Sequence, residues 1–251
     1  MKSAILSLAI LASLLATVLT HSQTTDETPN PLAEIQANLP RVIRVSAEFI
    51  EMPEATYTKL ISKPRSSADD TDLRAACAKL VEAGEASVLE TMCVTALPGQ
   101  SATTASIAEY IYPTEYEPGE VPEEVNGIAP GPNSPWGTPP TPSVFDAKNT
   151  GSTFEVEASI DQNDSFIELR FTPTIIWHVD TVNWGADKPS GAAGPIEMPT
   201  FYVLSVRTGA VVTPGNPTLV ATLSPKNDKG FTDFSRKVMV FIRADLLTVG
   251  K

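Results

Sequence analysis

Two cysteines, Cys77 and Cys93, are the only thiols of this 251-residue chain and stand sixteen positions apart. Cys77 is placed on the apolar face of a predicted helix and Cys93 in the β-branched run that follows. In an oxidising compartment they could form a disulfide that ties helix to sheet, which the chain-entropy model credits with about 3 kcal/mol. The alternative is two small buried residues that never meet, and the sequence leaves both open. No CxxC spacing and no nearby histidine accompany them, so a metal or redox site is not indicated.

The remaining candidates for chemistry are His178 with Asp180 and the run 161–164 (DQND). A Ser-His-Asp site would need a serine nucleophile, but the chain has no G-x-S-x-G motif, so we interpret His178 as a strand residue with a solvated ring. The run 161–164 offers oxygen ligands but lacks the glycine and the distal glutamate of an EF-hand loop, and it falls where a hairpin turn is needed. The sequence therefore predicts no catalytic residue, no cofactor and no metal site, indicates no small-molecule ligand, and favours a protein that is not an enzyme.

One amphipathic helix is expected where the first cysteine lies. Its apolar residues recur at helical spacing, with Asp72 as the predicted N-cap and Gly84 as the predicted stop. The residues of this apolar face are Leu73, Ala76, Cys77, Leu80 and Val81.

Strands are indicated by strict alternation of apolar and polar residues, which is typical of sheets with one buried and one wet face. The predicted strands are 42–51, 87–96, a run from Gln100, the two strands of a hairpin within 149–171, then 201–206, 219–223 and 237–247. A hairpin loop at 161–164 would place Glu155 opposite Arg170 and Val156 opposite Leu169. The expected fold class is α+β: a mostly antiparallel sheet with one helix packed on it.

The domain organisation follows from composition. Residues 1–22 have a short basic start and an apolar run typical of a signal peptide, with an uncleaved N-terminal anchor as the alternative. Residues 23–40 are polar and predict a flexible segment, and 41–251 predict a single domain. Many of the 22 prolines stand at 113–142 with a run of glutamates. We expect a long Pro/Glu-rich surface loop there, although a linker between two domains would have the same composition.

The charge of the chain restricts its partners. Eighteen basic and 30 acidic residues give a formal charge of −12. Nucleic-acid binding depends on neutralising phosphates with Lys and Arg, so we expect no nucleic-acid partner. Anionic lipid headgroups would repel the chain as well. After residue 22 no apolar stretch is long enough for a transmembrane helix, so no integral membrane span is expected.

The order of these elements is similar to that of the secretins, the bacterial outer-membrane rings of type II and type III secretion. Four sequence blocks carry the resemblance: VIRVSAEFIE at 42–51, the helix–strand–turn–strand segment at 72–104, the hairpin at 149–171, and KVMVFIRADLL at 237–247. The resemblance implies a secretin-like β-sheet core and a family without catalytic residues, whose chemistry is assembly.

The chain also departs from the secretin pattern. Residues 52–71 are too short for a gate insertion, and 224–236 are polar where secretins have an apolar lip. The N-terminal ring-forming domains are not found, and no set of strands of about ten residues with apolar outer faces can be placed. These departures predict a protein that is not a complete pore.

The functional expectation is therefore an exported, secretin-like structural protein of the bacterial cell envelope, in the periplasm or associated with the outer membrane. It would associate with itself or with proteins of a secretion or pilus system. The alternative is a stand-alone periplasmic or surface binding module that uses the Pro/Glu-rich loop and the loops around Trp136 or Trp184. A hydrolase that uses His178 is the least favoured hypothesis.

Overall fold

A computed structural model describes residues 39–63, 69–120, 122–129, 137–185 and 194–249. The chain divides into two units between Leu39 and Pro40, and the fold described below is that of the second. The predicted signal peptide (1–22) and all but the last two residues of the predicted flexible segment (23–40) lie outside the described residues.

The first of two antiparallel sheets contains the strands at both ends of this unit. Its order is β2-β1-β9-β8, with β1 Arg41–Pro53, β2 Ser87–Ala96, β8 Thr218–Leu223 and β9 Arg236–Thr248. β1 pairs with β9 from Arg41↔Thr248 to Pro53↔Arg236 without a shift in register. The strands predicted at 42–51, 87–96, 219–223 and 237–247 are confirmed.

The second sheet has the order β3-β4-β5-β6, and β7 pairs with β5 beside β6. Its strands are β3 Gln100–Glu117, β4 Thr141–Ile160, β5 Ile167–Asn183, β6 Glu197–Ser205 and β7 Thr208–Val212. β3, β4 and β5 are 18, 20 and 17 residues long. From the sequence, no set of strands of about ten residues with apolar outer faces could be placed; these three strands have the length, but exposed Glu157 and Arg170 stand on their outer face. Five residues at the start and two at the end of the predicted loop 113–142 belong to β3 and β4.

The core lies between the two sheets, where the alternating apolar residues of both meet. Phe49 of β1, Phe154 of β4, Leu169 of β5 and Val240 of β9 are all fully buried in one cluster. The sequence indicated these faces correctly but predicted one sheet. Two sheets form because the apolar face of each buries the other.

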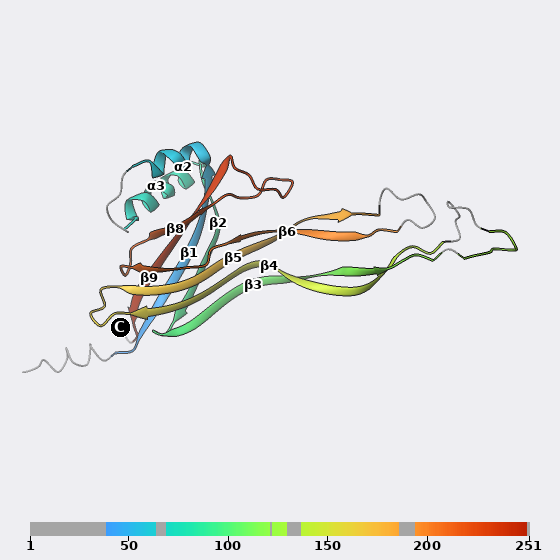
Figure 1. Cartoon of the computed structure of the whole chain (residues 1–251). Coiled ribbons are helices and arrows are strands. Elements are labelled where there is room, and N and C mark those ends of the chain that lie inside the picture. Colours follow the sequence, from blue (N-terminus) through green and yellow to red (C-terminus); the bar gives the residue numbers. More distant parts are fainter. Residues whose placement is uncertain (1–38, 64–68, 121, 130–136, 186–193, 250–251) are drawn as a thin grey trace, which may run out of the picture. The chain divides into compact units, whose positions relative to one another are not determined.

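Among the described residues, two helices and not the single one predicted cover the other face of the first sheet (Figure 1). They are α2 Glu54–Ile61 and α3 Thr71–Glu82. Cys77 of α3 packs with Ile50, Met52 and Met239. α3 begins one residue before the predicted N-cap Asp72; the N-cap is Asp70, whose carboxylate accepts a hydrogen bond from the Leu219 N–H of β8 at 2.8 Å. The helix ends as predicted, before Gly84 with φ +73°.

The hairpin between β4 and β5 has a register that differs by two residues from the predicted one. Ile160 pairs with Ile167, so the loop contains six residues, and Glu157, not Glu155, lies opposite Arg170. Asp161 holds this loop, because its Oδ1 accepts hydrogen bonds from the N–H groups of Ser165 (2.7 Å) and Phe166 (2.9 Å). A slip of two preserves which side chains face the core, so only the pairing partners change.

The second sheet separates into two hairpin arms at Gly151. The β4–β5 ladder ends at Gly151↔Ile176; beyond it, β4 pairs only with β3 and β5 only with β6 among the described strands. Gly151 has φ +114°, and a Cβ there would collide with the carbonyl oxygen of Ser106. We call the part of the β3–β4 hairpin beyond the Ile107–Gly151 pair the β3–β4 arm. The part of the β5–β6 hairpin beyond Ile176 is the β5–β6 arm.

Candidate functional site

The first candidate is the open edge of β3. Among the described strands, β3 pairs with β4 alone. The backbone groups of its even-numbered residues point toward β4: Thr150 Oγ1 donates to the carbonyl oxygen of Ala108 at 3.0 Å, and the Ser106 oxygen lies against Gly151. Because backbone groups alternate in direction along a strand, the N–H and C=O of Thr103, Ala105 and Ile107 point away from β4. An unpaired edge of this length is a ready template for pairing with another chain.

The opposite edge of the sheet is formed by β6 and β7, which both run antiparallel to β5. The Val206 N–H donates to the Pro173 carbonyl at 3.2 Å. The backbone N–H and C=O groups of even-numbered residues on this edge therefore point toward β5. Those of odd-numbered residues such as Ser205 and Gly209 point away from the sheet. At the far end of β6 the edge is covered, because the Tyr116 hydroxyl bonds both the N–H (2.9 Å) and the carbonyl (3.1 Å) of Glu197.

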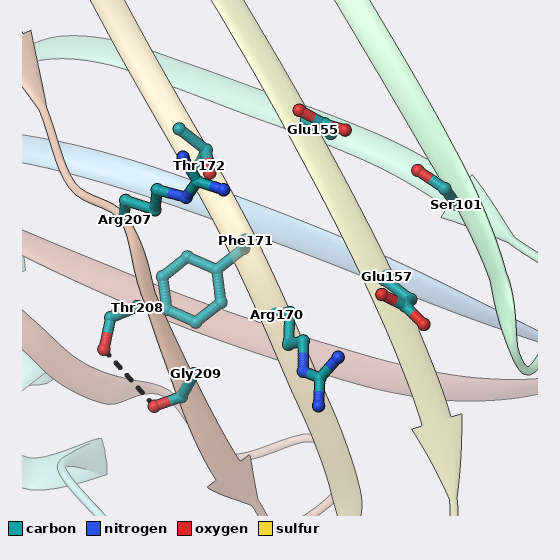
Figure 2. A pocket seen from close by; sticks show the side chains of 9 residues that line it. All are labelled: Ser101, Glu155, Glu157, Arg170, Phe171, Thr172, Arg207, Thr208 and Gly209. Carbon is teal, nitrogen blue, oxygen red and sulfur yellow. Dashed lines mark hydrogen bonds between the residues drawn. The ribbon is translucent and has the colours of Figure 1, made fainter.

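The outer face of this sheet, away from the core, holds a cavity of about 550 Å³. Its floor crosses the sheet from β3 to β7, and four of its nine lining residues are charged (Figure 2). The lining residues are Ser101, Glu155, Glu157, Arg170, Phe171, Thr172, Arg207, Thr208 and Gly209. These charged residues lie on the solvent-exposed face of the strands, as the alternation of apolar and polar residues predicts.

An aromatic cluster joins the two hairpin arms. The rings of Tyr110 and His178 stack with centroids 4.4 Å apart and planes 16° apart. Phe201 lies edge-on to both, at 5.8 Å from Tyr110 and 5.9 Å from His178. His178 Nε2 lies 3.0 Å from Thr181 Oγ1. His178 lies on β5 and is exposed, as predicted, and its ring also forms a contact between the two arms.

The structure brings His178 and Asp180 into no catalytic arrangement. Asp180 Oδ1 accepts the N–H of Thr181 at 2.8 Å, and the His178 ring meets the hydroxyl of the same threonine. The spacing of Tyr110 and Tyr112, which places both rings on one face of β3, is the sequence signal for this cluster; the contacts with Phe201 and His178 depend on the tertiary structure.

The two cysteines are not joined in a disulfide. Cys77 is buried, with its thiol 3.9 Å from Met239 Sδ, whereas Cys93 is exposed on β2 opposite Ser46. Because Cys93 is the cross-strand partner of Ser46, its side chain lies on the same side of the first sheet as the helices and Cys77. The disulfide that the sequence left open stays a prediction.

No feature of the described structure supports calcium binding by residues 161–164. Asp161 points at backbone N–H groups, and the bond from Phe166 lowers the pKa of its carboxyl below the ordinary 3.8. Within the described ranges, no three His, Cys, Asp or Glu side chains gather into a group that could hold a metal ion. No helix in this part of the chain is long and apolar enough to cross a membrane.

Comparison with known proteins gives matches among solved structures alone. No family model and no curated protein matches the chain. The pilotin–secretin AspS–GspD complex of ETEC is similar over 88% of this chain and 52% of its own, with 12% identity and a TM-score of 0.44. The type II secretin GspD of enteropathogenic Escherichia coli matches over 88% and 73% (13% identity, TM-score 0.41). The Salmonella SPI-1 injectisome secretin InvG matches over 88% and 69% (8% identity, TM-score 0.42).

All three are secretins, in agreement with the resemblance predicted from the order of the sequence blocks. The chain spans about half the length of the first of them. Identities and TM-scores this low assign no activity or partner to this chain.

Proposed function

We propose that this protein is an exported, secretin-like structural protein of the bacterial cell envelope that assembles edge to edge, with copies of itself or with proteins of a secretion or pilus system. The observation that carries the proposal is the unpaired edge of β3. Natural proteins usually shorten, cover or charge such an edge, because it pairs with any available strand. The half of β3 near the core is neither short, covered nor charged. The residues whose backbone groups point away from β4 there are Ser101, Thr103, Ala105 and Ile107.

The strand directions allow the same surface to repeat. β3, β4, β5 and the β6–β7 edge alternate in direction. A second copy that places its β3 beside β6 and β7 of the first therefore continues an antiparallel sheet. Such a head-to-tail contact uses different surfaces on the two copies, so it closes into a ring when the rotation between copies allows it.

The location in the periplasm or at the outer membrane rests on the signal-peptide pattern of residues 1–22. The proposal that the chain is not by itself a complete pore is supported by the outer face of the second sheet, which exposes Glu155, Glu157, Glu168 and Arg170. A charge at the centre of a bilayer costs about 2.5–3.5 kcal/mol on insertion scales. Purified protein added to liposomes should leave an encapsulated dye inside, and stepwise conductance in planar bilayers would contradict this part of the proposal.

Removing one backbone hydrogen-bond donor from the β3 edge tests the edge contact. Ala105→Pro removes an N–H that faces away from β4, so it leaves the β3–β4 ladder paired while blocking a bond to another chain. Ala105→Ser keeps the N–H and is the matched control. We expect the wild type and Ala105→Ser to form oligomers by light scattering and native mass spectrometry, and Ala105→Pro to remain monomeric with unchanged far-ultraviolet circular dichroism. A wild type that stays monomeric up to its solubility limit, or an Ala105→Pro variant that assembles normally, would refute edge pairing.

A stand-alone binding module is the second candidate, and the outer-face cavity is the observation in its favour. A wild-type chain that stays monomeric throughout the same concentration series would favour this alternative.

A further inference from the structure

The charged side chains of the outer face lie in two rows that cross the second sheet. The strand register places Ser101, Glu157, Arg170 and Gly209 opposite one another in the first row. In the second row Thr103 is opposite Glu155, and Glu155 is opposite Thr172. Arg207 precedes Thr208, the partner of Phe171, so it continues this row, and Figure 2 shows its side chain extending toward Thr172.

The charges along these rows are separated by sign. Both glutamates belong to β4, on the side of the β3 edge, whereas the two arginines belong to β5 and to the residue just before β7, on the side of the opposite edge (Figure 2). Glu168 of β5 also lies on this face, outside the cavity, and leaves the β5–β7 side net positive. The outer face is therefore acidic toward one edge and basic toward the other.

None of the four cavity charges is neutralised by another described residue. In this part of the chain, no ion pair within 4.0 Å involves Glu155, Glu157, Arg170 or Arg207. Glu157 and Arg170 are direct cross-strand neighbours, but their charged groups are not in contact. All four side chains are exposed, and Arg207 stands at the sheet edge itself.

We propose that in the assembled protein the Arg207 guanidinium of one copy binds the Glu155 and Glu157 carboxylates of the next copy. This inference rests on the proposed edge-to-edge assembly and assigns its direction. When β3 of one copy lies beside β6 and β7 of another, the basic side of one outer face meets the acidic side of the next. The opposite arrangement, in which like edges meet, would place like charges together.

The reach of the side chains suits this contact. Neighbouring strands are about 4.8 Å apart, so β4 of the next copy would lie two spacings, about 10 Å, from β7. Between them β3 of that copy presents the small side chains of Ser101, Thr103 and Ala105 on its outer face. A long arginine side chain can cross these residues, and a guanidinium can bind a carboxylate through two parallel hydrogen bonds.

Charge reversal tests the pairing. Arg207→Glu makes both sides of the outer face acidic, and Glu155→Lys/Glu157→Lys makes both basic, so we expect each protein alone to assemble at least tenfold more weakly. An equimolar mixture of the two should assemble, because each contact then joins opposite charges. The triple variant that carries all three changes should also assemble by itself. Lys59→Glu is the control, because it changes the net charge as Arg207→Glu does. Lys59 is an exposed residue of α2, outside the second sheet, and this variant should assemble like the wild type.

The outcomes separate this inference from the proposed function. If Arg207→Glu assembles like the wild type while Ala105→Pro does not, the charge pairing is refuted and edge assembly stands. If Arg207→Glu weakens assembly but neither the mixture nor the triple variant restores it, direct pairing is refuted. A monomeric wild type refutes both.

Discussion

The rings of Tyr110 on β3 and His178 on β5 stack at a centroid distance of 4.4 Å, although their strands are not neighbours in the sheet. β4 separates them in strand order, and the two arms meet only after the β4–β5 ladder has ended at Gly151. The stack therefore holds together two hairpins whose described residues share no backbone hydrogen bonds at that level.

Removing this stack should loosen the arms without unfolding the core. Aromatic pairs contribute about 0.5–1.5 kcal/mol beyond the area they bury. We expect His178→Ala to increase amide exchange at residues 108–116 and 177–183 severalfold, while residues 43–49 exchange as before. His178→Phe retains a ring and is the control. Unchanged exchange in His178→Ala would show that the stack does not hold the arms.

The β4–β5 loop should respond to acid through Asp161. Its backbone hydrogen bonds, that from Phe166 foremost, lower its pKa in the folded state below the ordinary value of 3.8. A group with a lowered folded pKa stabilises the fold above its unfolded pKa and loses that contribution as the pH falls through the folded pKa. Asp161→Ala should therefore be less stable than the wild type at pH 6, and the difference should shrink when urea titrations are repeated below pH 3. A difference that stays constant with pH would contradict this role.

The core prediction concerns Leu169, which is fully buried between the two sheets. Leu169→Ala leaves a cavity and should reduce the free energy of unfolding by about 2–5 kcal/mol. Glu168→Ala changes the adjacent residue on the wet face and should alter stability by about 0.5 kcal/mol or less. Chemical denaturation of both variants measures the contrast, and equal effects would mean that the faces of β5 are assigned incorrectly.

The two thiols should differ in accessibility. Cys93 is exposed and Cys77 is buried, so a maleimide should label Cys93 in the native protein and Cys77 only after unfolding. Mass spectrometry of the labelled protein counts the modified residues, and Cys93→Ser should abolish native labelling. If the protein isolated from an oxidising compartment takes up no label even when unfolded, the disulfide predicted as one possibility has formed.

The sequence by itself determined which side chains face the core. Alternation is a local property, and a strand with one apolar face must bury that face, so the inward orientation of Phe154, Leu169 and Phe49 follows from the sequence alone. The helix around Cys77 was predictable for the same reason, because its apolar residues recur at the helical period. α2 was missed because its eight residues give a short pattern, although Tyr57, Leu60 and Ile61 pack against the same cluster as α3.

Only the tertiary structure decided how these faces combine. The shift from Glu155 to Glu157 as the partner of Arg170 leaves every core face unchanged. Alternation could not distinguish the two registers, because they differ by a full period of the strand. The division into two sheets, the separation of the arms at Gly151 and the contact of Tyr110 with His178 depend on residues far apart in the sequence. The same holds for the separation of Arg207 from the two glutamates, because the order of strands across a sheet, and not their order along the chain, sets which charges stand at which edge.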